Sequence, residues 1–333
     1  MEKIALAHGS GGKLMHDLID SVFIGKFDNK ILRRKDDSAV FNVGKKRIAF
    51  TTDSYVVNPI FFPGGDIGSL AIYGTVNDLS VCGARPLAIS LGLIIEEGLD
   101  RNVLEKIAAS IADAAKRSGV DIVTGDTKVV EKGSCDKIFI NTSGIGEVYY
   151  GGLSLERIKS GDVVIVSGSV GKHAVSVLSK REGMEFRTKT KSDSAPLNGL
   201  IFNILKVSNK VRFMRDPTRG GLATTLNEIV EGRNFGISVD EKDVPVSGGV
   251  REACEMLGFD PLYMACEGRA IVIAAKEDAK NILNAMRRNK KGRIAAVIGQ
   301  ITKEHKGRVI LNTRAGGKRS LDMLAGEQLP RIC

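Results

Sequence analysis

Strand-like and helix-like patterns alternate along almost the whole chain, and this alternation limits the folds open to it more than any other feature. In the first half it predicts strands at 47–52, 86–95 and 137–148, a short buried strand at 122–125, and helices at 67–81 and from Asp100 to near Gly119. Together with the 38 glycines, the alternation indicates an α/β or α+β protein.

The second half repeats this mixture, and we place a domain boundary near residue 150. It contains a buried strand at 163–167, helical patterns at 173–181, 197–209, 222–231 and 250–257, an apolar strand at 270–275, and a closing pair of strands at 295–301 and 308–311. A length of 333 residues fits two domains of roughly 100–200 residues each. We therefore expect an N-terminal domain at 1–150, a C-terminal α/β domain at 151–325 and a mobile tail at 326–333.

Composition and charge argue against several classes of protein. Apolar residues make up 43% and charged residues 26% of the chain, which indicates a folded protein. The net charge is +10, but the basic residues are spread out and no nucleic-acid-binding motif is present, so we expect no nucleic-acid partner. No apolar run is long enough to cross a bilayer and the N-terminus lacks a signal-peptide core, so we expect a cytoplasmic protein without membrane association.

The five cysteines are scattered and include no CxxC pair, which argues against a disulfide framework and a structural zinc site. Cys333 differs from the other four because it is the last residue, on a segment without helix or strand periodicity. Pro330 cannot donate to a sheet and restricts Leu329 to an extended form. At about 3.3 Å per residue, the tail can reach roughly 23 Å, so we expect Cys333 to reach a site on another domain.

Four acidic residues of the first half stand at predicted strand ends, in a loop or in a helix of small residues: Asp36, Asp53, Asp78 and Asp126. We expect Asp53 and Asp126 each to end a strand, and Asp78 to lie inside the helix at 67–81, where an interior Asp has no propensity benefit. Mg²⁺ is usually bound by one or two carboxylates with phosphate oxygens and water, so these residues are candidate magnesium ligands. Each Asp taken alone fits a helix cap or a turn equally well.

A glycine-rich loop, residues 8–13 with the sequence His-Gly-Ser-Gly-Gly-Lys, precedes the first helix. Backbone N–H groups beside glycine, with a nearby lysine, suit phosphate, so Gly11, Gly12 and Lys13 are candidate nucleotide-binding residues. The loop matches neither a Walker A nor a GxGxxG pattern, and alone it is more often an ordinary turn.

Two further stretches of the second half are candidates for chemistry. Asp216 or Thr218 fits the cap of the next helix, and the following glycine pair allows a backbone or a phosphate to approach closely. Glu267 directly precedes the apolar strand at 270–275. It fits equally well a partner for Arg269 and a base near a closed site.

The chain resembles the aminoimidazole-ribonucleotide synthetase superfamily, also called PurM-like, and within it the HypE family of nickel–iron hydrogenase maturation factors. The superfamily motifs occur in order along nearly the whole chain: Asp36-Asp37, Thr52-Asp53, Gly74-Thr75-Val76-Asn77-Asp78-Leu79 with Gly83-Ala84-Arg85-Pro86, Gly125-Asp126-Thr127, and Asp216-Pro217-Thr218-Arg219-Gly220-Gly221. The family motifs are His8-Gly9-Ser10-Gly11-Gly12, Phe62-Pro63-Gly64-Gly65-Asp66-Ile67-Gly68 and the terminal Pro330-Arg331-Ile332-Cys333.

The resemblance implies a two-domain fold whose N-terminal domain pairs with its twin in a β-barrel dimer, with nucleotide sites near the interface. It also implies that a carbamoyl group passes from the partner HypF to the terminal cysteine. ATP then drives dehydration of this thiocarboxamide to a thiocyanate, and the cyanide passes to iron held by the HypC–HypD complex.

Residue roles follow from the same resemblance. Cys333 carries the substrate, Lys128 neutralises the transferring phosphoryl group or the oxygen that it attacks, and Glu267 is the base for the amide proton. Magnesium and triphosphate are held by four carboxylates, with two polar neighbours nearby: Asp36, Asp53, Asp78 and Asp126, with Asn77 and Thr127. We expect the terminal carboxylate to oppose ionisation of the thiol and Arg331 to favour it.

Two alternatives remain at this point. One is another ATP-dependent enzyme of the same fold, either selenophosphate synthetase or a small-molecule kinase, although the glycine-rich loop has His8 and Ser10 where selenophosphate synthetases carry a reactive cysteine or selenocysteine. The other is a nucleotide-gated scaffold whose tail docks a partner without chemistry.

Overall fold

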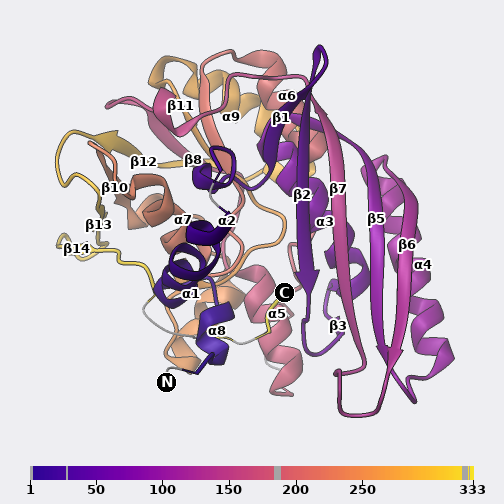
Figure 1. Cartoon of the computed structure of the whole chain (residues 1–333). Helices are drawn as coiled ribbons and strands as arrows, with labels where there is room; N and C mark the ends of the chain where they lie inside the picture. Colours follow the sequence, from indigo (N-terminus) through magenta and orange to yellow (C-terminus); the bar gives the residue numbers. More distant parts are fainter. Residues whose placement is uncertain (1–2, 28, 184–188, 325–328, 330) are drawn as a thin grey trace.

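The computed structural model describes residues 3–27, 29–183, 189–324, 329 and 331–333. The described elements form two α/β halves, each built on one large sheet, and the C-terminus lies between them beside α5 (Figure 1).

The N-terminal half contains an open five-stranded sheet in the order β1-β2-β7-β5-β6. Its strands are β1 (Ala39–Val43), β2 (Lys46–Tyr55), β5 (Ala84–Glu96), β6 (Asp121–Val130) and β7 (Ile138–Val148). Strands β5 and β6 are parallel and are joined through α4 (Arg101–Ser118), whereas the other pairs are antiparallel. A small hairpin of β3 (Phe61–Phe62) and β4 (Gly65–Asp66) precedes α3 (Ile67–Val81).

Helix α3 packs on one face of this sheet, and α4 packs beside α3. Nearly all of α3 is buried, because apolar and small residues cover its whole circumference. Asp66 caps its first turn through hydrogen bonds from the backbone N–H groups of Gly68 and Ser69. Helix α4 begins at the predicted cap, Asp100, and ends at Gly119 in the left-handed region, with φ of 67°.

The C-terminal half contains a seven-stranded sheet in the order β14-β13-β10-β12-β8-β11-β9. Its strands are β8 (Val163–Val166), β9 (Val211–Arg215), β10 (Gly236–Asp240), β11 (Ile271–Ala274), β12 (Ala296–Thr302), β13 (Val309–Asn312) and β14 (Lys318–Ser320). The longer helices are α5 (Lys172–Arg181), α6 (Asn198–Val207), α7 (Gly221–Val230), α8 (Gly248–Leu257) and α9 (Ala279–Arg287).

The N-terminal segment precedes the first sheet in the sequence but lies in front of the C-terminal half (Figure 1). It consists of the short helix α1 (Lys13–Leu18), a π-helical turn at Ile19–Ile24 and α2 (Gly25–Phe27). His16 on α1 contacts Glu228 on α7 at 3.0 Å, which fastens this segment to the second half.

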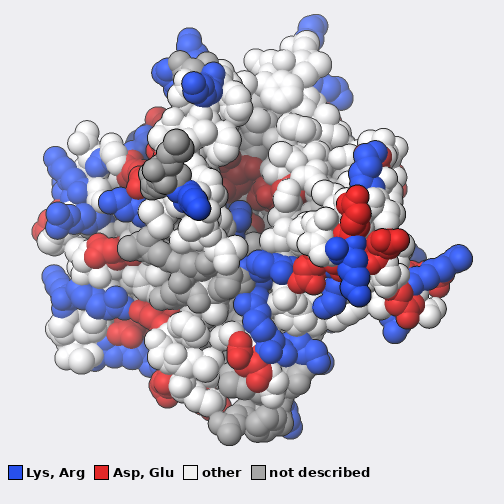
Figure 2. Space-filling model, turned by 60° about the horizontal axis from the view of Figure 1, so that its bottom comes forward, with Lys and Arg blue, Asp and Glu red and all other residues white. Residues whose placement is uncertain are grey.

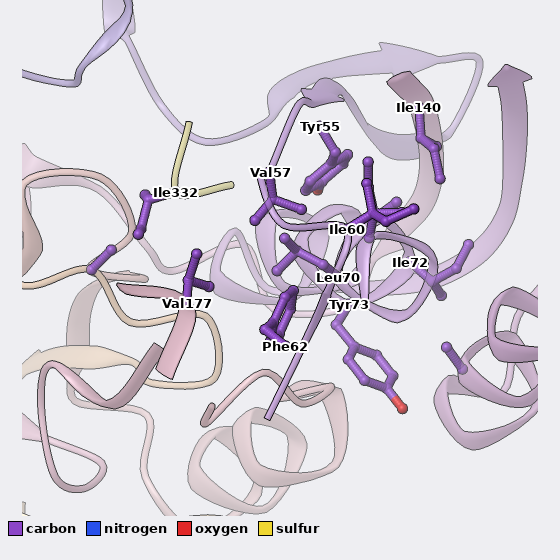
Figure 3. Close-up of a cluster of buried hydrophobic side chains, with 14 of the residues drawn as sticks. Tyr55, Val57, Ile60, Phe62, Leu70, Ile72, Tyr73, Ile140, Val177 and Ile332 are labelled. Carbon is purple, nitrogen blue, oxygen red and sulfur yellow. The ribbon is translucent and has the colours of Figure 1, made fainter. Parts of the chain in front are cut away.

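One hydrophobic cluster joins the two halves and includes the tail (Figure 3). Tyr55, Val57 and Leu70 come from the N-terminal half, Val177 comes from α5, and Ile332 of the tail is 4% exposed within the same cluster. Burial of one isoleucine side chain stabilises by about 1.5–3 kcal/mol. The hydrophobic effect therefore favours a tail that lies between the halves.

Several sequence predictions need correction. The strand predicted at 122–125 is the ten-residue edge strand β6, and its residues are exposed rather than buried in the single chain. Asp126 therefore lies inside β6, and Asp53 lies inside β2, rather than at strand ends. The predicted closing strands do not pair with each other, because β10 lies between β12 and β13.

No helix formed by the described residues packs on the second face of the five-stranded sheet. Large apolar side chains on this face are 40–44% exposed, among them Phe50, Ile94 and Ile145. The sheet is open, so the predicted barrel requires a second copy of the chain and remains a prediction. No helix in the described part of the chain combines the length and the apolar character needed to span a membrane.

Candidate active site around the terminal cysteine

The end of the tail is bound through its main chain. The backbone N–H of Val56 donates to a main-chain oxygen of Cys333 at 3.1 Å, and that of Asn58 donates to the carbonyl of Arg331 at 3.2 Å. The Nε2 atom of His173 lies 2.7 Å from the carbonyl oxygen of Ile332. Because a carbonyl only accepts, Nε2 carries the hydrogen, and Nδ1 accepts from the hydroxyl of Ser192 at 2.8 Å.

Two arginines complete the docking of the tail. Arg331 donates to the carboxylate of Asp136 at 2.7 Å and to the carbonyl of Val56 at 2.9 Å. Arg181 on α5 donates to the carbonyl oxygens of Asn58 and Arg331. The described end of the tail therefore contacts both halves. The rest of the segment predicted to be mobile, 326–328 and 330, lies outside the described residues.

The thiol of Cys333 is in a buried, largely acidic environment. Burial, opposed by the charge of Arg219 and assisted by the charges of Glu267 and Asp53, raises its pKa to about 12. The prediction that Arg331 promotes ionisation is therefore wrong, because the guanidinium of Arg331 is paired with Asp136. The thiol is thus neutral and chemically quiet while the tail is docked.

Buried carboxyl groups surround this position, and acidic side chains are visible at the floor of a hollow between the halves (Figure 2). Burial and mutual repulsion raise the pKa values of Asp78, Asp216 and Glu267 well above the ordinary carboxyl value, and Asp53 contributes to each of these shifts. Asp53 accepts a hydrogen bond from the Tyr55 hydroxyl at 3.2 Å, and Asp78 accepts one from Thr51 at 2.8 Å. This cluster concentrates negative charge that a cation would offset.

Glu267 is 3% exposed, and its Oε1 atom has no hydrogen-bond partner among the described residues. The sequence left open whether Arg269 pairs with Glu267. In the structure Arg269 pairs with Asp193, and the distance from Arg269 Nε to Asp193 Oδ2 is 3.3 Å. One carboxyl oxygen of Glu267 is therefore unpartnered inside the site among the described residues, which favours the prediction that it acts as a base.

Asn77 is fully buried, and its side chain binds the protein backbone. It donates to the carbonyl oxygens of Ala195 and Glu267 at 3.1 and 3.4 Å, and it accepts from the N–H of Leu197 at 2.7 Å. In this structure Asn77 positions the segment before β11 that contains Glu267, whereas the sequence predicted that Asn77 contacts the nucleotide.

Asp36 and Asp37 lie at the other end of the site and line a small cavity. Asp37 pairs with the buried Arg215 at 2.8 Å, and Arg215 also pairs with Glu228 at 3.1 Å. Burial raises the pKa of Asp37 to about 6 despite Arg215, and burial likewise raises the pKa of Asp36. Asp36 remains exposed and available to a ligand.

Asp126, Thr127 and Lys128 are separate from this site in the single chain. Thr127 of β6 is in register with Tyr55 of β2, but three strand spacings away, which is about 14 Å. Asp126 and Lys128 pair with each other at 2.9 Å on the exposed edge strand. A long edge strand with this exposure places these residues where a second copy of the chain, rather than the same chain, could use them.

The glycine-rich loop lies against residues 216–221, called here the arginine loop, and against Leu324, which shortly precedes the tail. Gly11 has φ of +83°, and a Cβ atom there would lie 2.7 Å from Cβ of Arg219. The backbone N–H of Lys13 donates to the carbonyl of Leu324 at 2.8 Å. Contact of Gly11, Gly12 and Lys13 with phosphate therefore stays a prediction, and the Lys13 N–H is already bonded in this structure.

Sequence reasoning missed Arg219, Asp136, His173 and Arg181 as functional candidates. Arg219 stands inside the quoted Asp216–Gly221 motif, so its position was a usable signal. His173 interrupts an apolar helix pattern, which alone is more often a core histidine. Nothing in the sequence near Asp136 indicates a contact with a residue 195 positions away.

The carboxylate cluster suits magnesium in the chemistry of its donors. Among the residues that the structure describes, no three His, Cys, Asp or Glu side chains are arranged as ligands of one metal ion. Magnesium bound with a nucleotide needs only one or two carboxylates, because phosphate oxygens and water supply the other ligands. Asp53 and Asp78 fit that requirement, because they belong to the cluster in which burial and repulsion raise the pKa values of Asp78, Asp216 and Glu267.

Comparisons with known proteins identify the family of the chain. The family model "AIR synthase related protein, N-terminal domain" matches residues 35–148, and the model of the C-terminal domain matches 159–312. The carbamoyl dehydratase HypE of Bradyrhizobium diazoefficiens is 48% identical over 332 residues, which are 99% of this chain and 96% of that protein. The chain belongs to the HypE family of carbamoyl dehydratases.

Solved HypE structures share the whole fold. A HypE–HypF complex has a TM-score of 0.87 at 45% identity, covering 92% of this chain and 99% of that chain. HypE in complex with ATP has a TM-score of 0.83 at 47% identity, covering 99% of this chain and 100% of that one. The predicted fold class and HypE resemblance are confirmed, and the selenophosphate synthetase, kinase and scaffold alternatives are not favoured.

Proposed function

We propose that this HypE-family enzyme uses ATP to dehydrate a carbamoyl group that Cys333 carries as a thiocarboxamide. The observation that carries this proposal is the docked position of Cys333, beside Asp53, Glu267 and Arg219. A thiol with a pKa of about 12 is a poor nucleophile in place, but its side chain is correctly situated to present a group already attached to sulfur. Cys333 then acts as the carrier, and the surrounding residues act on its cargo.

The reaction balances in two steps. The amide oxygen attacks the γ-phosphorus of ATP, ADP leaves, and the nitrogen loses one proton, which gives an S-bound carbon with an O-phosphoryl group and a C=N–H bond. Glu267 in its ionised form then accepts the second N–H proton while the C–O bond to phosphate breaks, which forms the C≡N bond. The unpartnered Oε1 atom of Glu267 supports this role as proton acceptor.

Arg219 has a complementary role in this proposal. Nearby anionic groups raise its pKa, first the ionised form of Cys333 and then Asp53 and Glu267, so the guanidinium is charged at neutral pH even while the thiol is neutral. A fixed cation there stabilises negative charge that develops on the phosphoryl group. Asp53 and Asp78 would hold magnesium, and magnesium when bound offsets the charge of the triphosphate.

Lys128 and Asp126 enter the site only from a second chain in this proposal. The uncovered face of the five-stranded sheet, with Phe50, Ile94 and Ile145 partly exposed, supports a homodimer formed through that face. Such a dimer would bring β6 of the partner toward the nucleotide. The proposed barrel and the predicted phosphoryl contact of Lys128 thus depend on the same interface.

The proposed partners are HypF, which donates the carbamoyl group, and the HypC–HypD complex, which accepts cyanide. A relative at 45% identity is solved as a HypE–HypF complex, which supports the first. HypF must reach the thiol, so the docked tail must leave its site before carbamoyl transfer. The reducing cytoplasm is the compartment we propose, since the five cysteines are unpaired in this structure.

Intact-mass measurement with HypF and ATP tests the function. We expect one carbamoyl adduct on Cys333 after incubation with HypF and its carbamoyl donor, followed by loss of one water when magnesium and ATP are added. Cys333→Ala should bind ATP normally and show neither change. An ATP-independent loss of water, or an adduct whose mass ATP leaves unaltered, would contradict the proposal.

A further inference from the structure

The glycine-rich loop contacts the tail at the point where the tail leaves the C-terminal half. The chain is fixed to that half up to residue 322, through hydrogen bonds that Leu321 and Asp322 accept from Asn227 and Tyr263. The next described anchor is Leu324, whose carbonyl accepts from the N–H of Lys13 at 2.8 Å. The loop therefore holds the last described residue before the segment that carries Cys333.

Gly12 is specifically adapted to this contact. A Cβ atom at Gly12 would lie 2.5 Å from the carbonyl oxygen of Leu324 and 3.3 Å from its carbon. Both are backbone atoms, so they cannot move aside as a flexible side chain can. The backbone conformation of Gly12, with φ of −92° and ψ of −169°, is open to any residue. Gly12 is thus required by the close approach of the tail and not by its own dihedral angles.

The same loop also holds the arginine that faces the thiol. The Arg219 side chain donates to the carbonyl of Gly9 at 3.1 Å, and Gly11 packs directly on the Arg219 backbone. A small cavity is lined jointly by the loop, the arginine loop and the tail, through Ser10, Arg219 and Ile332. The loop, Arg219 and the tail therefore form one packed unit around the end of the chain.

We propose that the glycine-rich loop at 9–13 is a positioning element for Cys333, which fixes both the start of the tail and the Arg219 side chain. The proposal rests on the proposed role of Cys333 as carrier, and it assigns to the loop a task other than phosphate binding. Its prediction is that a change in the loop alters how well the tail is docked, without any need for nucleotide.

Alkylation of Cys333 by iodoacetamide, followed by peptide mass spectrometry of the full-length protein, reports docking directly. Cys333 is partly buried when docked and its thiol pKa is raised to about 12, so it reacts slowly, whereas a released thiol reacts as an ordinary cysteine. We expect Gly12→Ala to speed alkylation of Cys333 about tenfold, the factor that about 1.4 kcal/mol of overpacking produces. Gly9→Ala is the matched control, because a Cβ there meets no atom within 4 Å, and it should stay within about twofold of the parent.

A second pair of variants tests the hydrogen bond itself: proline has no N–H, and its Cδ atom would occupy the position from which the N–H donates to Leu324. Lys13→Pro deletes the N–H that Leu324 accepts, and proline suits this first position of α1 after an extended Gly12. Lys13→Ala keeps the N–H and removes only the ammonium group. We expect faster alkylation of Cys333 in Lys13→Pro and the parent rate in Lys13→Ala.

Calorimetric titration with magnesium and ATP separates this proposal from the phosphate-binding interpretation. If Gly12→Ala and Lys13→Pro weaken ATP binding while alkylation of Cys333 keeps the parent rate, the loop is a nucleotide element and the proposal is overturned. Equal alkylation rates in all four variants overturn it as well. Neither readout uses HypF or the dehydration step, so a failed carrier role for Cys333 would be recognised separately in the intact-mass experiment.

Discussion

The carboxylate of Asp136 accepts a hydrogen bond from the guanidinium of Arg331 at 2.7 Å and so connects the loop between β6 and β7 to the tail. The same loop is anchored by Glu96 at the end of β5, which accepts hydrogen bonds from the backbone N–H groups of Gly133 and Lys137. The segment that holds the tail is therefore continuous with β6, the edge strand on which Lys128 lies.

Loss of the Asp136 carboxylate should loosen the tail. Both partners are partly exposed, at 29% and 38%, so the pair contributes about 0.5–1 kcal/mol. Asp136→Ala should accordingly increase the alkylation rate of Cys333 about two- to fivefold. Asp113→Ala, which removes a comparable exposed pair with Arg117 on α4, is the control and should leave the rate unchanged.

Docking of the tail should depend on pH above neutrality. Docking raises the pKa of the Cys333 thiol to about 12, so the docked state favours the neutral thiol. The stabilisation is fully present below the ordinary thiol pKa of about 8.5 and is lost as pH rises from there toward 12. Chemical shifts or fluorescence of a probe near the tail should therefore report release above about pH 9, and Cys333→Ala should show no such transition.

Glu267→Gln should separate stability from catalysis. Burial and neighbouring carboxyl groups raise the pKa of Glu267, so ionisation of this group opposes folding at pH values above the ordinary glutamate pKa. The free energy of unfolding of Glu267→Gln should exceed that of the parent by at least about 1 kcal/mol near pH 8 and by less near pH 4. Denaturant titration at the two pH values measures this difference.

The same variant should bind ATP and accept a carbamoyl group on Cys333, but it should not dehydrate that group. Intact mass after addition of ATP provides the readout. Normal loss of water in Glu267→Gln would remove Glu267 from the reaction, whatever its effect on stability.

Lys128 should act on the Cys333 of the partner chain. Neither Lys128→Ala nor Cys333→Ala alone should produce thiocyanate, but a re-equilibrated equal mixture should recover about one quarter of the parent activity, because half the dimers are mixed and each has one complete site. Measurement of thiocyanate per chain in the mixture checks this. An inactive mixture with proven subunit exchange would show that Lys128 acts within its own chain or not at all.

Asn77→Ala should destabilise the protein more than it affects nucleotide binding. The substitution leaves the buried N–H of Leu197 without its 2.7 Å acceptor, which costs about 1–3 kcal/mol. Urea unfolding monitored by circular dichroism measures the loss. A stability equal to that of the parent, combined with weaker ATP binding, would favour the nucleotide contact that the sequence predicted for Asn77.

Local signals in the sequence located many of the secondary-structure elements. Helix α3 occupies the predicted residues, and α4 begins and ends at the predicted Asp100 and Gly119, because caps and helical periodicity depend on neighbouring residues. Strand β6 was misjudged because its apolar residues, such as Val123 and Val129, indicate a core position, although in the single chain they are 63% and 67% exposed. A pattern of apolar residues does not distinguish a core from a surface that another chain covers.

The site was only partly predictable for a related reason. Carboxylates and a thiol are recognisable from residue type alone as groups that can bind a cation or carry out chemistry, and this identified Asp53, Asp78, Glu267 and Cys333. The docking of the tail depends on main-chain carbonyl groups, which every residue has, so no sequence pattern marks Val56 or Arg181 as their partners. The choice of Arg219 over Arg331 as the cation near the thiol depends on where each guanidinium is held, which is settled only in three dimensions.

The hydrogen bonds that hold the tail are made by the main-chain oxygens of Arg331, Ile332 and Cys333 and by the side chain of Arg331. Among the described residues none is made by the sulfur atom of Cys333. These contacts therefore bind the tail without any hydrogen bond to the group that the Cys333 sulfur carries. A bare thiol, a carbamoylated sulfur and a thiocyanate all leave these main-chain contacts available, so the same docking site can bind the tail at every stage of the cycle. The order of the steps in the cycle must then be set by the chemistry at the sulfur and by the proteins that transfer groups to and from it, and not by the docking contacts themselves.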